Sequence, residues 1–273
     1  MSSTSGRRLS LHHLTVMDVS PVELIDIAYR SGCQHVCFFI YMPIDVRHRY
    51  PMVGPSDVLA LREAMLRTGV TPFNLEVFPL STDAHLSEMV DGLALGSALG
   101  ARHATVHVHE ENLEIAAGLL QRFCAMAEAY GITVGLEYNS FSKVSTPASA
   151  MALVNAAGCS NLGIIADFLH TVRSGAGADD LAAIHEAIGY AQICDGLAQM
   201  PLDQRWREAI SDRMVPGTGD FALSAMVAAL PDDIVIDVEV PQRVARENGV
   251  SAWKRAREAV AATRLLLDRD PWR

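Results

Sequence analysis

Short apolar runs alternate with longer amphipathic segments along almost the whole of this 273-residue chain. Each run has the length and composition of a buried strand, and each amphipathic segment has helical periodicity. Strands that alternate with helices in this way pair in parallel. We predict strands over residues 9–15, 35–40, 71–77, 103–108, 133–137, 162–167, 190–195 and 234–239. Helices are expected from Ser20 onward and over residues 56–68, 82–99, 113–130, 146–157, 178–188, 221–230 and 250–267.

Eight strand-helix units favour a closed barrel over an open doubly wound sheet. The length of 273 residues is close to the roughly 250 that a (β/α)8 barrel requires. No Gly-x-Gly-x-x-Gly motif follows the first strand, which argues against a dinucleotide-binding fold. No stretch has the composition of a linker. We therefore expect residues 1–273 to form a single domain, a (β/α)8 or TIM barrel.

Charge and composition exclude several classes of partner. A net charge of −10 argues against binding a nucleic-acid backbone, which requires clustered lysine and arginine. No stretch approaches the roughly 20 uncharged apolar residues of a membrane span. The five cysteines are odd in number and scattered, which is typical of reduced thiols in the cytoplasm. We expect a soluble cytoplasmic protein, and a homodimer is possible, although no interface is visible in the sequence.

Four polar residues stand at or next to the ends of the last four predicted strands: Glu137, Asp167, Gln192 and Glu239. In a parallel barrel these ends meet at one mouth. Three carboxylates and an amide gathered there would repel one another unless a cation lay among them. Oxygen ligands favour Mg²⁺ or Mn²⁺. The pattern therefore predicts a divalent-metal site at the mouth of the barrel.

Five further residues are candidates for contact with a substrate. His170 is expected in the loop after the sixth strand, where it could polarise a substrate oxygen or relay a proton. His107 and Glu76 end the fourth and third strands and could face the mouth. Asp195, at the start of the seventh loop, could bind a substrate hydroxyl or support a ligand, and Arg213 lies further along that loop. The other histidines expected at the surface or in loops are His13, His48, His85, His103 and His185.

Two loops that follow strands are longer than the usual few residues. They cover residues 41–55 and 196–220, and long loops of this type lie on the catalytic face of a barrel. Their arginines could form lids or bind an acidic group of a substrate. These arginines are Arg47, Arg49, Arg205, Arg207 and Arg213.

Five short motifs, in this order and spacing, resemble the sugar phosphate isomerase/epimerase superfamily of xylose isomerase-like TIM barrels. They are Gly135-Leu136-Glu137, Asp167-x-x-His170, Gln192-x-x-Asp195, Arg213-x-x-Pro216-Gly217-x-Gly219 and Asp237-Val238-Glu239. The resemblance implies a divalent metal, usually Mn²⁺, Mg²⁺ or Co²⁺. It also implies that the ligands are Glu137, Asp167, Gln192 and Glu239.

One position departs from the epimerase pattern. The ligand on the seventh strand is usually histidine in the epimerases, and here it is Gln192. A glutamine at this position is similar to the bacterial 3-dehydroshikimate dehydratases of the same superfamily. Endonuclease IV, another member, uses a histidine-rich trinuclear zinc site whose ligands this chain lacks.

The resemblance implies an enzyme that removes a proton next to the carbonyl of a sugar-like polyhydroxy compound. Glu137 or Glu239 would be the base, and His170 would orient or protonate a substrate oxygen. Return of the proton to carbon gives an isomerase or epimerase, which we take as the first hypothesis. Loss of a β-hydroxyl would instead give a dehydratase. A barrel that binds a sugar without catalysis is the remaining alternative, and it predicts missing metal ligands or a blocked mouth.

Overall fold

A computed structural model describes residues 7–83 and 86–268, and their strands close into one barrel. Each strand pairs in parallel with its neighbours in the chain, and β8 pairs with β1 to complete the circle. The predicted (β/α)8 fold is thus confirmed. The strands are β1 (Leu9–His12), β2 (His35–Phe39), β3 (Thr71–Leu80), β4 (His103–Val108), β5 (Thr133–Glu137), β6 (Leu162–Asp167), β7 (Ile188–Ile193) and β8 (Val235–Val238).

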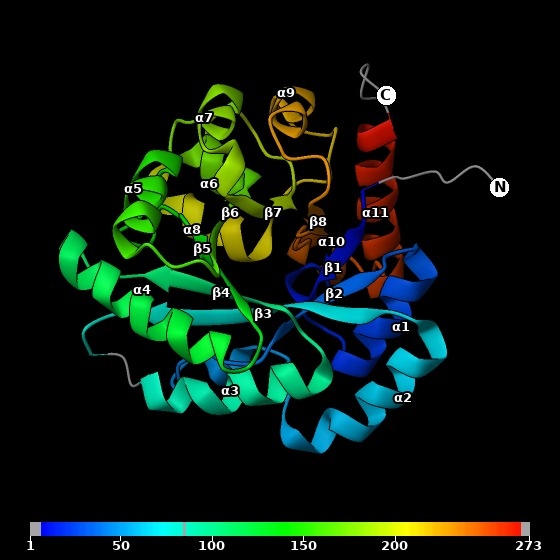
Figure 1. Cartoon of the computed structure of the whole chain (residues 1–273). Helices are drawn as coiled ribbons and strands as arrows, with labels where there is room; N and C mark the ends of the chain where they lie inside the picture. The colour runs from blue at the N-terminus through cyan, green and yellow to red at the C-terminus, as the bar shows by residue number, and fades with distance from the viewer. Residues whose placement is uncertain (1–6, 84–85, 269–273) are drawn as a thin grey trace.

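Helices surround the strands on the outside of the barrel (Figure 1). Helix α11 packs against α1 and so covers the region where β8 meets β1. The α-helices are α1 (Pro21–Ser31), α2 (Val58–Thr68), α3 (Leu86–Leu99), α4 (Leu113–Glu128), α5 (Pro147–Ala157), α6 (Phe168–Arg173), α7 (Ala178–Ala183), α8 (Leu202–Ser211), α9 (Leu223–Ala228), α10 (Arg243–Glu247) and α11 (Ala252–Asp268). Four 3-10 turns accompany them: η1 (His13–Val16), η2 (Arg47–Arg49), η3 (Pro55–Asp57) and η4 (His185–Ala187).

The start and end of α1 show how local sequence sets the helix boundaries. The Ser20 hydroxyl accepts the backbone N–H of Glu23, and the Glu23 carboxylate accepts the backbone N–H of Ser20. This capping box agrees with the helix start expected at Ser20. Pro21 occupies the first turn, where its missing N–H costs no hydrogen bond. Gly32 ends the helix with a φ of 83°, a backbone conformation that side chains with a Cβ rarely adopt.

The apolar core lies between the strands and the surrounding helices. Leu11, Val36 and Ile236 on neighbouring strands are completely buried, as are Leu24 and Ile25 on α1. Both faces of a parallel barrel strand are covered, which explains why these strands are continuous apolar runs in the sequence.

Several predicted boundaries are wrong, and the third strand extends to Leu80 instead of ending at residue 77. The first strand ends at His12, because residues 13–16 turn into η1 and Thr15 donates its hydroxyl to the carbonyl of Val238. The helix predicted over 178–188 stops at Ala183, and Ile188 already pairs with Ile164 as the first residue of β7. The seventh strand therefore covers residues 188–193 rather than 190–195. The two long loops contain ordered segments of their own, η2 and α8.

Candidate functional site

The four residues proposed as metal ligands lie together at the C-terminal ends of β5 to β8. Glu137 and Asp167 are the last residues of their strands, Gln192 lies one residue before the end of β7, and Glu239 directly follows β8. Each is at most 4% exposed. Asp167 and Gln192 are directly paired across β6 and β7. Parallel pairing thus gathers these side chains at one end of the barrel, as the sequence predicts.

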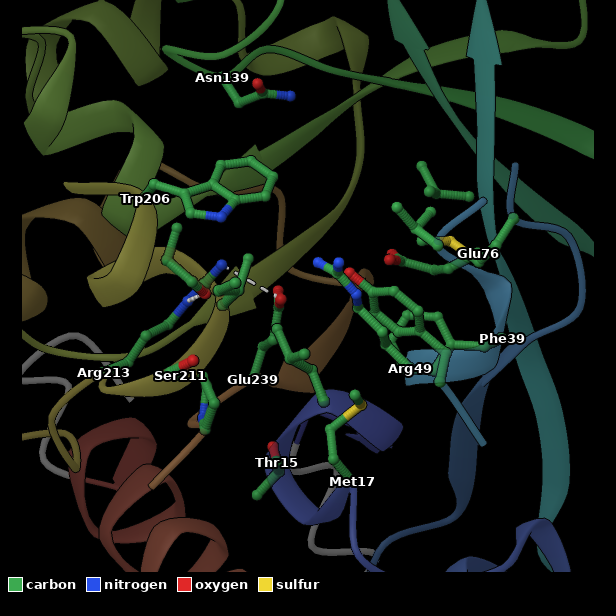
Figure 2. A pocket seen from close by; sticks show the side chains of 18 of the residues that line it. Thr15, Met17, Phe39, Arg49, Glu76, Asn139, Trp206, Ser211, Arg213 and Glu239 are labelled. Carbon is green, nitrogen blue, oxygen red and sulfur yellow. Dashed lines mark hydrogen bonds and ion pairs between the residues drawn. The ribbon is translucent and has the colours of Figure 1, made fainter. Parts of the chain in front are cut away.

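Arg213 joins two of these residues. Its Nη1 lies 2.7 Å from Asp167 Oδ2, and its Nη2 lies 3.1 Å from Glu239 Oε1. Figure 2 shows the guanidinium of Arg213 directed at the carboxylate of Glu239. The Arg213 side chain is only 3% exposed, and its Nε donates to the carbonyl of Ala209 at 2.9 Å. In this structure the guanidinium neutralises two buried carboxylates, so substrate binding by Arg213 stays a prediction.

Glu137 lies between two histidines. Its Oε2 is 2.9 Å from His107 Nε2, and its Oε1 is 3.5 Å from His170 Nε2. Coordinating atoms of Glu137, Asp167 and His170 all lie within 4.8 Å of one another. His170 is not in a loop as the sequence suggested, because α6 begins directly after β6. Asp167 caps this helix by accepting the backbone N–H of His170 at 2.9 Å.

Glu76 is the centre of a hydrogen-bond network inside the barrel. Its Oε1 accepts from Asn74 Nδ2 at 3.2 Å, Thr105 Oγ1 at 3.0 Å and Gln192 Nε2 at 3.2 Å. Because a carboxylate only accepts hydrogen bonds, the amide nitrogen of Gln192 must face Glu76. The amide oxygen of Gln192 therefore points away from Glu76, and it is buried without a hydrogen-bond partner among the described residues.

Asp195 has a different environment from the other predicted site residues. It is 1% exposed, and both carboxylate oxygens accept backbone N–H groups of its own loop. Oδ1 binds the N–H groups of Gly196 and Phe221, and Oδ2 binds those of Gly217 and Gly219, at 2.8–3.1 Å. A Cβ on Gly219 would lie 2.5 Å from Asp195 Oδ1, so only glycine fits beside it. These contacts favour a role in organising the loop over contact with a substrate.

A cavity of about 610 Å³ opens above this cluster. Glu76, Glu137 and Glu239 line it, as do His107, His170 and Arg213, whereas Asp167 and Gln192 lie behind its wall. Aromatic side chains from three different loops form part of its surface. Trp206 packs edge-on against Phe141 with ring centres 4.9 Å apart, and Tyr50 contacts Phe39 at 4.8 Å.

Burial shifts the pKa values of the acid-base groups in opposite directions. Burial raises the pKa of Glu239 well above its usual value, even though Arg213 opposes the rise. For Asp167 the opposing charge of Arg213 outweighs burial, so its pKa is lowered. Burial lowers the pKa of His170, whereas the Glu137 carboxylate overcomes burial and raises that of His107. Glu239 thus holds a proton more tightly than an exposed carboxylate, and His170 holds one less tightly than an exposed imidazole.

A sequence model of the family described as xylose isomerase-like TIM barrels matches residues 25–264. The chain belongs to this family. A search of curated proteins finds no match. The family assignment agrees with the resemblance carried by the five motifs.

Solved structures share the architecture of this xylose isomerase-like barrel at low sequence identity. The IOLI protein with a bound zinc atom is 18% identical, with a TM-score of 0.79 over 96% of this chain and 98% of that one. A probable 3-DHS dehydratase, AsbF from Bacillus anthracis, is 16% identical, with a TM-score of 0.76 over 96% and 99%. A D-allulose 3-epimerase from Methylomonas sp. is 17% identical, with a TM-score of 0.70 over 97% and 98%. At these identities the likeness establishes the fold alone.

The donor atoms of this xylose isomerase-like barrel fit a hard divalent cation. Gln192 Oε1 and Glu239 Oε2 are buried acceptors without a hydrogen-bond partner among the described residues. Glu137 and Asp167 place coordinating oxygens within 4.8 Å of each other and of a His170 nitrogen, in a group that does not include Glu239. Buried acceptors of this kind are costly unless a donor or a cation satisfies them. All four of the proposed ligands can supply an oxygen donor.

A second group of coordinating side chains lies deeper in the barrel. Atoms of His12, Cys37 and Asp237 lie within 4.8 Å of one another, and all three residues are buried. The backbone N–H of Leu14 donates to His12 Nδ1 at 2.9 Å, so the proton of the neutral ring must be on Nε2. A protonated nitrogen does not coordinate a metal. This tautomer favours a polar core cluster over a second metal site.

Some features of the site were missed or misplaced by the sequence analysis. The aromatic wall of Phe141 and Trp206 was not predicted, although a tryptophan in a long loop after a strand is a usable signal. His13 is completely buried, not at the surface, and its Nε2 lies 3.1 Å from the carbonyl of Val19. His85 lies outside the described residues. Within the described part of the chain, no helix is long and apolar enough to span a membrane.

Proposed function

We propose that the protein is a divalent-metal-dependent enzyme that removes a proton next to the carbonyl of a sugar-like polyhydroxy compound. The observation that carries this proposal is that two buried glutamates, Glu137 and Glu239, line one cavity at the strand ends where Asp167 and Gln192 are paired behind its wall. Isomerisation or epimerisation is the first candidate outcome. The cavity of about 610 Å³ is large enough for a small substrate and argues against a blocked, purely structural mouth.

Glu239 is the better placed base of the two glutamates. Its Oε1 is held by Arg213, which leaves Oε2 without a partner in the described structure. Burial raises its pKa, so its affinity for a proton is greater than that of an exposed carboxylate. Glu137 has both oxygens beside histidines, which suits a residue that holds a ligand or passes a proton to His107 or His170.

Glu137, Asp167, Gln192 and Glu239 would hold the cation, and Mn²⁺ or Mg²⁺ suits their oxygens, with Co²⁺ as a further possibility. The cation would supply Lewis-acid polarisation of the carbonyl and so make the neighbouring C–H acidic. His170 lies beside Glu137 with its ring 6.0 Å from Phe141. From this position an N–H of its neutral imidazole can donate a hydrogen bond to a substrate oxygen as negative charge develops there.

Gln192 supports dehydration as the second candidate. A histidine is usual at this position in epimerases, and a glutamine here is similar to the 3-dehydroshikimate dehydratases of the same superfamily. Proton removal next to the carbonyl is common to both outcomes. They differ only in whether the proton returns to carbon or a β-hydroxyl leaves.

Deuterium exchange tests the common step. The protein is loaded with Mn²⁺ and incubated in D₂O with 3-dehydroshikimate and with a panel of ketoses, and NMR follows deuterium at the carbon next to the carbonyl. We expect exchange with at least one compound and a loss of about 10²- to 10⁴-fold in Glu239→Gln. An aromatic product from 3-dehydroshikimate would identify the dehydratase, and interconversion of ketoses would identify the isomerase or epimerase.

Glu258→Gln is the matched control, because Glu258 is an exposed glutamate on α11, away from the cavity. It should leave exchange unchanged. Elemental mass spectrometry of the same samples reports whether metal is retained. Full exchange in Glu239→Gln, or exchange that is equally fast after complete removal of metal, would contradict the proposal.

A further inference from the structure

Arg49 is a cation in the cavity that the protein itself does not use. It lies on η2, in the long loop after β2, and it lines the cavity. Figure 2 shows its side chain extending from the side of Phe39 into the cavity, toward the space between Glu76 and Glu239. The backbone N–H of Arg49 donates to the carbonyl of Val46, but its side chain has neither a hydrogen bond nor an ion pair within residues 7–83 and 86–268.

Most other arginines of the cavity are already paired with carboxylates. Arg213 binds Asp167 and Glu239 inside the mouth. At the rim the ion pairs are Arg243 with Asp212 and Glu247, and Arg255 with Asp18. Among the described lining residues, Arg246 is the other arginine without an ion pair, and like Arg49 it is exposed. Arg246 lies on α10, where its charge acts on Arg255, whereas Arg49 extends toward the space between Glu76 and Glu239.

The charge of the site makes an additional cation significant. Four acidic side chains, Glu76 and the three of the proposed metal site, gather at the mouth of the barrel, and Arg213 is paired with two of them. Such a site repels an anionic substrate unless another cation binds it. A guanidinium without a protein partner provides that charge, and its planar donors match a carboxylate or a phosphate.

We infer that Arg49 binds an anionic group of the substrate, and that the substrate is therefore a polyhydroxy carbonyl compound bearing a carboxylate or a phosphate. The carbonyl part of this statement rests on the proposed function, whereas the anionic part rests on Arg49. Arg49 determines specificity and takes no part in proton transfer. The ring of Tyr50, which follows Arg49 in the chain, packs against Phe39 and holds the base of the turn at the cavity wall.

Calorimetric titration of the Mn²⁺-loaded protein tests the inference with four probes. These are 3-dehydroshikimate as the carboxylate, D-ribulose 5-phosphate as the phosphate ester, inorganic phosphate, and D-allulose as the uncharged sugar. We expect at least one charged probe to bind more tightly than D-allulose. In Arg49→Gln its affinity should fall about 10- to 100-fold, and Arg49→Lys should recover part of the loss. If a probe is turned over, KM should rise more than kcat falls.

Arg47→Gln is the matched control. Arg47 lies in the same turn, and its replacement by glutamine removes the same charge. Its side chain donates to the carbonyl of Met42, however, and it does not line the cavity. It should leave the affinity for every probe unchanged. Comparison of the affinities for 3-dehydroshikimate and D-ribulose 5-phosphate shows whether the site prefers a carboxylate or a phosphate.

Three results would overturn the inference: equal affinity of Arg49→Gln and the parent for the charged probes, tighter binding of D-allulose than of any charged probe, or no binding of a charged probe by the parent. Failure of the proposed function is distinguishable from these. Arg49-dependent binding without deuterium exchange would retain the anion site and refute the enzyme mechanism. If D-allulose instead undergoes deuterium exchange that Arg49→Gln does not change, the enzyme mechanism is retained and the anion site is refuted.

Discussion

Arg213 Nη1 lies 2.7 Å from Asp167 Oδ2 in the mouth of the barrel. The same guanidinium lies 3.1 Å from Glu239 through its second nitrogen. Both carboxylates belong to the four oxygen donors proposed to hold a metal, and both are buried. The guanidinium of Arg213 therefore neutralises part of the negative charge that a divalent cation would neutralise in this site. A metal that enters the site must share these carboxylates with Arg213 or move it aside.

Replacement of Arg213 should therefore have opposite effects on stability and on metal binding. In Arg213→Gln the metal-free protein retains two buried carboxylates without a counter-charge, so its free energy of unfolding should fall by about 3–5 kcal/mol. The same loss of positive charge should raise the affinity for Mn²⁺ about tenfold or more. Urea unfolding of the metal-free protein and titration with Mn²⁺ measure the two effects separately.

A second buried ion pair provides the control for Arg213. Arg173 binds Glu208 at 2.7 Å through Nε, and the side chains of both are 3% exposed. Arg173→Gln should lower stability to a similar extent without tightening Mn²⁺ binding, because Glu208 is not among the proposed ligands. Weaker Mn²⁺ binding by Arg213→Gln than by the parent would show that Arg213 supports the metal instead of competing with it.

The sequence was informative about the barrel because strand burial and helix caps are local properties. The capping box of Ser20 and Glu23 could be recognised from four adjacent residues. The end of β1 could not be recognised in this way. Residues 13–16 leave the strand, and Thr15 donates its hydroxyl to the carbonyl of Val238, which is 223 positions away in the chain. The boundary of β7 was also missed, because Ile188 is apolar enough to suit either a helix or a strand.

The candidate site was predictable to the same extent and for the same reason. A charged residue at the end of an apolar run must emerge at the mouth, which placed Glu137 and Asp167 correctly at strand ends. Which partners these residues choose depends on contacts across the barrel. Arg213 is 46 positions from Asp167, and nothing local shows that its guanidinium turns inward. Whether the four residues bind metal stays a prediction.

Gln192 should set the preference of the site among metals. Its amide oxygen is a hard donor, whereas a histidine at the same position would offer a nitrogen, which favours Zn²⁺ and Co²⁺. We expect Gln192→His to raise the ratio of Zn²⁺ to Mn²⁺ affinity on the order of tenfold. Competition between the two metals, followed by elemental mass spectrometry, measures this ratio. Gln121→His on the exposed face of α4 should leave it unchanged, and an unchanged ratio in Gln192→His would argue against Gln192 as a ligand.

Asp195 should matter for the order of the seventh loop. Its carboxylate accepts four backbone N–H groups, and an asparagine would replace one accepting oxygen with a donor that faces those N–H groups. We expect Asp195→Asn to lower the free energy of unfolding by about 2 kcal/mol. Limited proteolysis should then cut the loop over residues 196–220 sooner than in the parent. Asp203→Asn, an exposed change in the same loop, should do neither, and an unaltered cleavage rate in Asp195→Asn would contradict the loop role.

His13 should make the protein less stable as the pH falls. It is completely buried, its Nε2 faces the carbonyl of Val19, and its Nδ1 has no partner among the described residues. Burial lowers the pKa of His13 to about 3, whereas a histidine in the unfolded chain titrates near 6.5. Below pH ~6.5 the unfolded state therefore binds a proton that the folded state does not, and stability is lost progressively down to the folded pKa.

The His13 contribution can be separated from that of other buried histidines by comparing slopes. Between pH 7 and pH 5.5 it should cost about 1 kcal/mol. His13→Gln keeps a donor for Val19 but cannot titrate, so its loss of stability over this interval should be smaller than the parent's by that amount. Replacement of the exposed His48 by glutamine should leave the slope as in the parent. Urea unfolding at both pH values measures all three proteins, and identical slopes for the parent and His13→Gln would show that His13 already exchanges its proton in the folded state.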